Sequence, residues 1–120
     1  MYLKISEEAL AKLAPYDTED TVFVLDLDDG VGKYSKMGVC SLDTSFRLLV
    51  LNKEQEHSDY EESIKSDAGE IYIKEYSKIY MAEEMTLAVD PRLQVLKLES
   101  PSGTLDNNVP IVDLRSAADQ

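Results

Sequence analysis

The chain opens with the pattern of a short strand and then of one amphipathic helix. Residues 2–5, YLKI, indicate a short strand, and residues 6–14, SEEALAKLA, place apolar side chains at helical spacing. Ser6 is a typical N-cap residue, acidic residues follow in the first turn, and Pro15 is expected to end the helix. We expect the helix to pack on a sheet through the residues that share one face: Leu10, Leu13 and Ala14.

Strand patterns dominate from residue 21 onward. In TVFVLDLD, residues 21–28, Phe23, Leu25 and Leu27 occupy one face, and Asp26 and Asp28 occupy the other. The run SFRLLVLN is apolar enough to predict a strand buried on both faces. Turn signals such as Asp29-Gly30, Asp90-Pro91 and Ser102-Gly103 separate these patterns from the remaining predicted strands, which are GEIYIKEY (69–76), MTLAVD (85–90), LQVLKLES (93–100) and NVPIVDL (108–114).

The segment EYSKIYMAEEM, residues 75–85, carries two conflicting signals. Tyr72, Tyr76 and Tyr80 recur every four residues, which fits a helix, but the strand patterns on both sides favour a second hairpin. We prefer a strand here. With about six strands and one helix, the chain is predicted to be a mostly β, α+β protein. Its expected form is a compact antiparallel β-sandwich or flattened pseudo-barrel with the N-terminal helix packed on it, spanning residues 1–115 as a single domain with a loose tail at 116–120.

Composition narrows the classes of partner. The 120 residues include 12 Lys and Arg against 24 Asp and Glu, a formal net charge of −12. Such a field repels phosphate backbones and anionic lipids, so we expect no nucleic acid and no membrane partner. It attracts metal cations or a basic protein face, although solubility alone explains an acidic surface. A single cysteine and the absence of a signal-peptide pattern favour an intracellular, cytoplasmic protein.

Three short motifs fail as functional sites. In GVGKYS, residues 30–35, the lysine is followed by tyrosine, so the phosphate-loop spacing is not met. In DLDDG, a calcium-loop count from Asp26 places Gly30 fifth, which favours a solvated strand end and turn. His57 stands alone in a polar, acidic stretch and is expected at the surface. Since no nucleophile, base and acid can be assembled, we expect no enzyme.

Cys40 is the one residue with candidate metal chemistry. It lies in a glycine-containing stretch before the strand at residues 45–52, where an exposed thiolate can bind zinc or iron. One thiolate is not enough, because cluster iron normally takes four ligands, so carboxylates, His57, a second subunit or an external thiol must complete the shell. The residues alone favour an inert cysteine over a ligand.

The order of these pieces resembles the HesB/IscA-like iron-sulfur cluster biosynthesis family, also called A-type carriers. ISEEALAKL is similar to the opening strand end and helix of that family, VFVLDLDDG to its first long strand, and GVCSLDTSFRLLVL to its cysteine loop and following strand. The segment AGEIYIKEYSKIYMAEEMTLAVD is similar to the part that follows. The resemblance covers nearly the whole chain.

The resemblance implies a fold, a cargo and one ligand. It implies a compact β pseudo-barrel with a packed helix, binding of iron or an iron-sulfur cluster, often at a dimer interface, and protein partners of cluster assembly. Cys40 matches the first ligand cysteine of the family, whereas the C-terminal Cys-Gly-Cys is replaced by SPSGTLDNNVPIVDLRS. The expected function is therefore non-enzymatic: Cys40 thiolates of a homodimer hold iron or a labile cluster and pass it on by ligand exchange. The alternative is a metal-free protein-interaction module that retains the fold.

Overall fold

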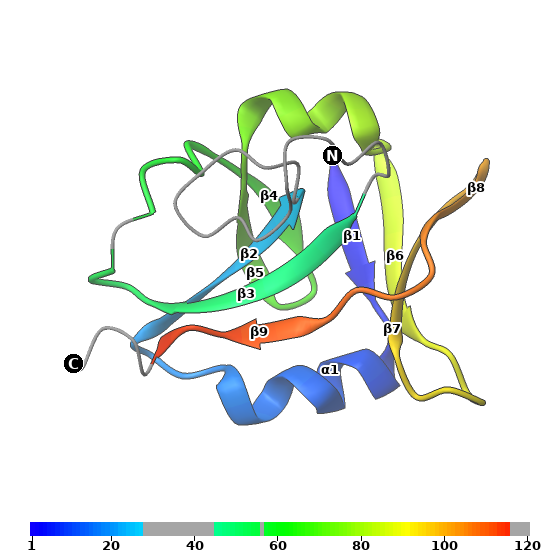
Figure 1. The fold of residues 1–120 in the computed structure, drawn as a ribbon, viewed down its shortest axis with the longest axis horizontal. Helices are drawn as coiled ribbons and strands as arrows, with labels where there is room; N and C mark the ends of the chain where they lie inside the picture. The colour runs from blue at the N-terminus through cyan, green and yellow to red at the C-terminus, as the bar shows by residue number, and fades with distance from the viewer. Residues whose placement is uncertain (28–44, 56, 116–120) are drawn as a thin grey trace.

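One curled sheet forms the body of the protein. The structure, a computed structural model, describes residues 1–27, 45–55 and 57–115. Within these ranges nine strands form a half-barrel in the order β8-β7-β6-β1-β4-β5-β2-β3-β9 (Figure 1). The strands are β1 (Tyr2–Ile5), β2 (Thr21–Leu27), β3 (Phe46–Asn52), β4 (Glu62–Ser66), β5 (Gly69–Ile73), β6 (Glu84–Val89), β7 (Leu96–Ser100), β8 (Gly103–Asp106) and β9 (Ile111–Asp113).

The mostly β class with one α-helix is confirmed, and the single sheet combines antiparallel hairpins with parallel pairings between them. Among the described strands, four pairings are antiparallel: β2–β3, β4–β5, β6–β7 and β7–β8. Four others are parallel: β1–β4, β1–β6, β2–β5 and β3–β9. The hairpins give the antiparallel pairs, and long-range pairing between hairpins gives the parallel ones. The structure is therefore a pseudo-barrel of one mixed sheet rather than a sandwich.

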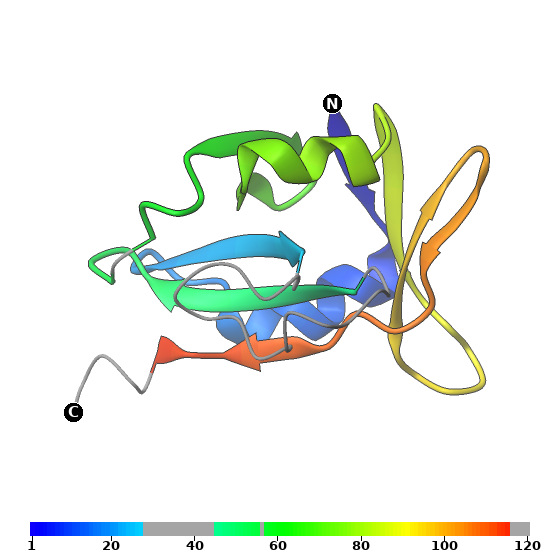
Figure 2. The ribbon, with the colours of Figure 1, turned by 45° about the horizontal axis from the view of Figure 1, so that its top comes forward.

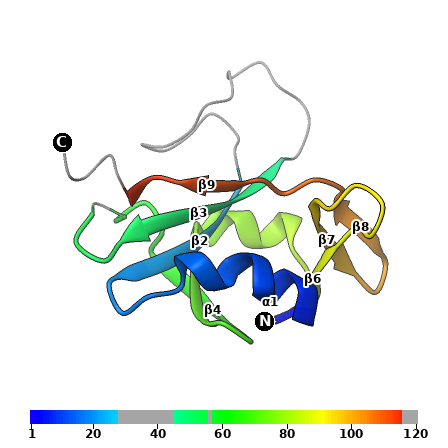
Figure 3. The ribbon, with the colours of Figure 1, turned by 90° about the horizontal axis from the view of Figure 1, so that it is seen from below.

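The N-terminal helix forms as the sequence predicts, with a corrected buried face. In α1 (Glu7–Leu13), the Ser6 hydroxyl accepts a hydrogen bond from the Ala9 amide at 3.2 Å, which confirms the N-cap. The chain then tightens into the 3₁₀ turn η1 (Ala14–Tyr16), which contains Pro15. Ala9 and Leu13 are buried, while Ala14 is exposed because it belongs to the turn and not to the helix. Figure 3 shows α1 lying across the curled sheet.

The two faces of the sheet bury separate clusters. Phe23, Leu25 and Leu27 of β2 lie in the main core together with Leu48 and α1. The intervening residue Val24 points to the opposite face and packs in a second cluster with Leu49, Leu51 and Tyr60. Strand β3 is buried from Phe46 to Leu51, so the prediction of a strand buried on both faces is confirmed.

The preference for a strand across residues 75–85 is wrong for its first half. Residues Glu75–Tyr80 form a 3₁₀ helix, η2, and β6 begins only at Glu84. Ser77 turns the chain, since its amide and its hydroxyl both donate to the Lys74 carbonyl, at 3.0 and 2.6 Å. The consecutive residues Ile79 and Tyr80 are 78% and 45% exposed, so neither side of this segment offers the buried face that a strand requires.

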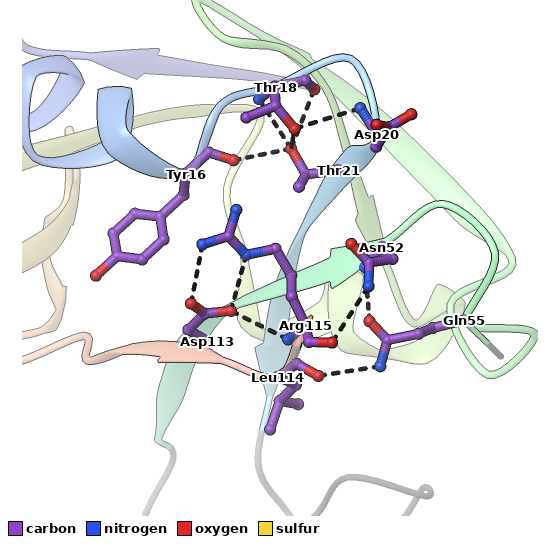
Figure 4. Close-up of polar contacts among 9 residues, drawn as sticks. All are labelled: Tyr16, Thr18, Asp20, Thr21, Asn52, Gln55, Asp113, Leu114 and Arg115. Atoms are coloured by element: carbon purple, nitrogen blue, oxygen red, sulfur yellow. Dashed lines mark hydrogen bonds and ion pairs between the residues drawn. The ribbon is translucent and has the colours of Figure 1, made fainter. Parts of the chain in front are cut away.

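Polar contacts hold the two ends of the sheet in place. The Val109 amide donates to the Leu96 carbonyl at 2.8 Å, which connects β7 with the segment leading into β9. At the far end of β3, the side chains of Asn52 and Gln55 donate to the carbonyls of Arg115 and Leu114 at 3.2 and 3.1 Å (Figure 4). No helix in the part of the chain that the structure describes has the length and apolar composition needed to cross a membrane.

Candidate functional site

A buried group of charges lies at one end of the β2–β3 pair. Asp26 and Arg47 are direct partners in the register of these strands, and the Arg47 Nε lies 2.9 Å from Asp26 Oδ2. Lys74 follows β5 directly, and its Nζ lies 3.2 Å from Asp26 Oδ1. All three side chains belong to the face opposite the main core. They are joined there because β5, β2 and β3 are neighbours in the sheet.

Asp26 corrects the expectation of a solvated strand end. Its side chain is fully buried, and the side chains of Arg47 and Lys74 are only 6% and 3% exposed. A buried carboxylate is costly unless it is paired, so the two basic partners explain how it is tolerated. The group is a structural ion-pair cluster at the base of the β2–β3 connection.

Tyr60 borders this cluster. Its ring packs with Val24 and Leu49, and the Lys74 Nζ lies 5.8 Å from the ring centroid. Burial raises the pKa of the Tyr60 hydroxyl, and the negative charge of Asp26 raises it further. Tyr60 is therefore a neutral phenol at neutral pH.

Both ends of the connection that carries Cys40 are fixed by side chains from remote elements. The Lys74 Nζ donates to the carbonyl of Leu27, the last residue of β2, at 3.2 Å. The amide of Phe46, the first residue of β3, donates to Asp106 Oδ2 at 2.8 Å.

The predicted site residues divide into those outside and those inside the described ranges. Cys40, Asp28 and the tail at 116–120 lie outside them. His57 lies inside and is half-buried, with its Nδ1 2.8 Å from the Gln55 carbonyl and its ring centroid 5.3 Å from that of Tyr72. Within residues 1–27, 45–55 and 57–115, no group of three or more His, Cys, Asp or Glu side chains is arranged to hold a metal ion.

The buried charges were missed from sequence, although a signal was present. Arg47 stands inside an apolar run that is predicted to be buried on both faces, so its charge requires a buried partner. The alternation of β2 puts Asp26 on the face opposite Leu25 and Leu27, but pattern alone does not show that Asp26 and Arg47 face each other.

Both the sequence and the fold match known proteins. Residues 1–113 match a family model described as iron-sulphur cluster biosynthesis. A crystal structure of a "putative Fe-S biosynthesis protein" from Lactobacillus salivarius, described as having a novel protein fold, is 39% identical with a TM-score of 0.87 and covers 96% of this chain and 99% of its own. A second "putative Fe-S biosynthesis protein", from Lactobacillus acidophilus, is 26% identical with a TM-score of 0.74 over 98% of this chain and 92% of its own.

A search of curated proteins gave no significant match. The family model nevertheless spans almost the entire sequence, and both solved relatives share the fold along nearly their whole length. The resemblance drawn from the sequence is thereby confirmed. This chain belongs to the iron-sulphur cluster biosynthesis family.

Proposed function

We propose that this protein acts in iron-sulfur cluster biosynthesis without catalysis, by binding iron or a labile cluster as cargo and passing it to a partner protein. The observation that carries the proposal is the family match across residues 1–113, which includes the only cysteine of the chain. A thiolate is the side-chain ligand best suited to iron-sulfur chemistry, so Cys40 is the first metal ligand in this proposal.

One thiolate per chain determines the form of the binding. The described residues supply no three-ligand group, and the C-terminal cysteine pair of A-type carriers has no counterpart in this sequence. The remaining ligands are then carboxylates, His57, an external thiol or groups of a second subunit, and a homodimer that shares the cargo between two Cys40 thiolates is the simplest arrangement. Few protein ligands favour release of the cargo by ligand exchange.

Iron binding by Cys40 is tested by anaerobic reconstitution with ferrous iron and sulfide. We expect the wild-type protein to bind iron, to develop visible absorbance and to elute as a dimer in size-exclusion chromatography. The Cys40→Ser variant should lose all three properties, because a hydroxyl is a poor ligand for iron at neutral pH. Ser41→Ala, which changes the neighbouring residue, should behave like the wild type.

The second candidate is a metal-free protein-interaction module of the same family. The single cysteine and the lack of a metal-binding group among the described residues favour it. Equal iron content in wild type and Cys40→Ser would contradict the carrier proposal and leave this second function as the better one.

A further inference from the structure

A groove crosses the outer face of the β1–β6–β7 part of the sheet. Its volume is about 660 Å³, and it is walled by side chains of these strands and by the turn between β4 and β5. These strands are neighbours on the side of the molecule away from the end of β3 (Figure 1). The side chains that line it include Tyr2, Lys4, Asp67, Glu84, Thr86 and Glu99.

Strand register explains why these residues share one face. Tyr2 pairs with Glu84, and Thr86 pairs with Lys4 on one side and with Glu99 on the other. The alternate residues of the same strands, Leu3, Met85 and Leu98, are buried in the main core. Because side chains alternate across a strand, the groove is the outward face of a sheet whose inward face is fully packed.

Two carboxylates remain available to a ligand in this groove. Asp67 is already engaged, because the Tyr2 hydroxyl donates to its Oδ1 and the Ile5 amide donates to its Oδ2 at 2.8 Å. Glu84 is exposed, and Glu99 has only a 4.0 Å contact with Lys97, a separation at which surface ion pairs contribute little. Lys4 is the one basic side chain in the lining, against the three carboxylates of Asp67, Glu84 and Glu99, so the groove keeps an excess of negative charge, on both β6 and β7.

Exposed apolar side chains also lie on η2, which precedes β6 in the chain. Tyr2, held by Asp67, is 41% exposed, and its amide donates to the Glu83 carbonyl at 2.9 Å. That bond places the start of β1 beside the chain that leaves η2, as Figure 2 shows. On η2, Ile79 is 78% exposed and Tyr80 is 45% exposed. Exposed aromatic and aliphatic side chains beside acidic ones are typical of protein-binding surfaces.

We propose that this groove binds an extended segment of another protein that carries lysine or arginine together with apolar side chains. The charge of the groove selects this occupant. Nucleic acid is anionic, and a second copy of the chain would bring a further −12 of net charge. A metal ion is disfavoured because the described residues hold no metal-binding group. The inference does not depend on iron binding by Cys40, which lies on a different connection.

The groove is tested with a labelled peptide of about seven residues alternating lysine and valine, whose extended length of roughly 23 Å matches a strand. Binding is measured by fluorescence anisotropy at about 0.15 M salt, where exposed charges act over only about 8 Å. We expect the double variant Glu84→Gln/Glu99→Gln to bind at least about tenfold more weakly than wild type. The matched control Glu19→Gln/Glu54→Gln removes two exposed charges elsewhere and should bind within about twofold of wild type.

Further measurements separate the groove from general acidity and from loss of folding. Thermal melts should show that the double variant is folded. Thr86→Lys, which places a cation on the groove floor, should weaken binding independently, and a peptide alternating glutamate and valine should not bind. In NMR titrations the amide shifts should map to β1, β6 and β7. Absence of peptide binding by the wild type, equal weakening by both double variants, or shifts confined to other strands would each overturn the proposal.

Discussion

A single carboxylate, that of Asp26, lies between two basic side chains without contact with solvent. Asp26→Asn keeps the shape of the side chain but removes the charge that compensates Arg47 and Lys74. Removing one partner from a buried ion-pair group is strongly destabilising, and we expect a loss of about 3 kcal/mol in the free energy of unfolding. Urea denaturation followed by circular dichroism measures it.

An exposed aspartate next to the same strand gives the control for that substitution. Asp20 lies just before β2 and its side chain is exposed. Asp20→Asn should change the unfolding free energy by no more than about 0.5 kcal/mol. If Asp26→Asn were equally mild, the buried pairing would be of no importance for stability.

At the scale of elements, the first turn of α1 depends on one hydroxyl. Ser6→Ala removes the acceptor for the Ala9 amide, and loss of an N-cap costs about 1 kcal/mol of stability. Ser6→Asp retains a side-chain acceptor and should remain within about 0.5 kcal/mol of wild type. Equal destabilisation by both substitutions, measured by urea denaturation, would show that the cap is not what matters at this position.

Elements with strong patterns were predictable, and weakly patterned ones were not. The α1 cap, the alternating face of β2 and the apolar run of β3 follow from local rules. Strand β4 buries only Ile64 inside a charged stretch, and edge strand β8 is exposed or half-buried throughout, so neither gives a periodic signal. Both are strands because of their neighbours, which a local pattern does not contain.

At the scale of the whole molecule, the family was predictable from the order of motifs, whereas the buried charges and the groove were not. The resemblance along the chain gave the family, while Cys40 as a metal ligand stays a prediction. The meeting of Asp26, Arg47 and Lys74 depends on parallel pairing of β5 with β2, a contact between distant segments. Such pairings are set by the global arrangement of hairpins, so neither the buried charges nor the groove on β1, β6 and β7 could be located from sequence.

The stability of the folded protein at low pH depends on all 24 acidic residues, whose protonation has two opposing effects. Protonation relieves repulsion within a chain of net charge −12, which favours the folded state. Against this, hydrogen bonds lower the pKa of three aspartates in the folded protein. The Tyr2 hydroxyl donates to Asp67, the Leu93 amide to Asp90 and the Arg115 side chain to Asp113. A lowered folded pKa gives stability that is present above the unfolded value, about 3.9, and is lost as pH falls through the folded value.

Comparing a variant with wild type at two pH values cancels the common effect of repulsion and isolates one carboxylate. Asp67→Asn should be less stable than wild type at about pH 6, and the difference should narrow at about pH 3, because the unfolded wild-type chain takes up this proton more readily than the folded protein below the unfolded pKa of about 3.9. Urea denaturation midpoints measure both differences. Glu54→Gln, at an exposed position, should differ little from wild type at either pH. A difference for Asp67→Asn that stays constant or widens on acidification would mean that the Asp67 hydrogen bonds do not favour its charged form.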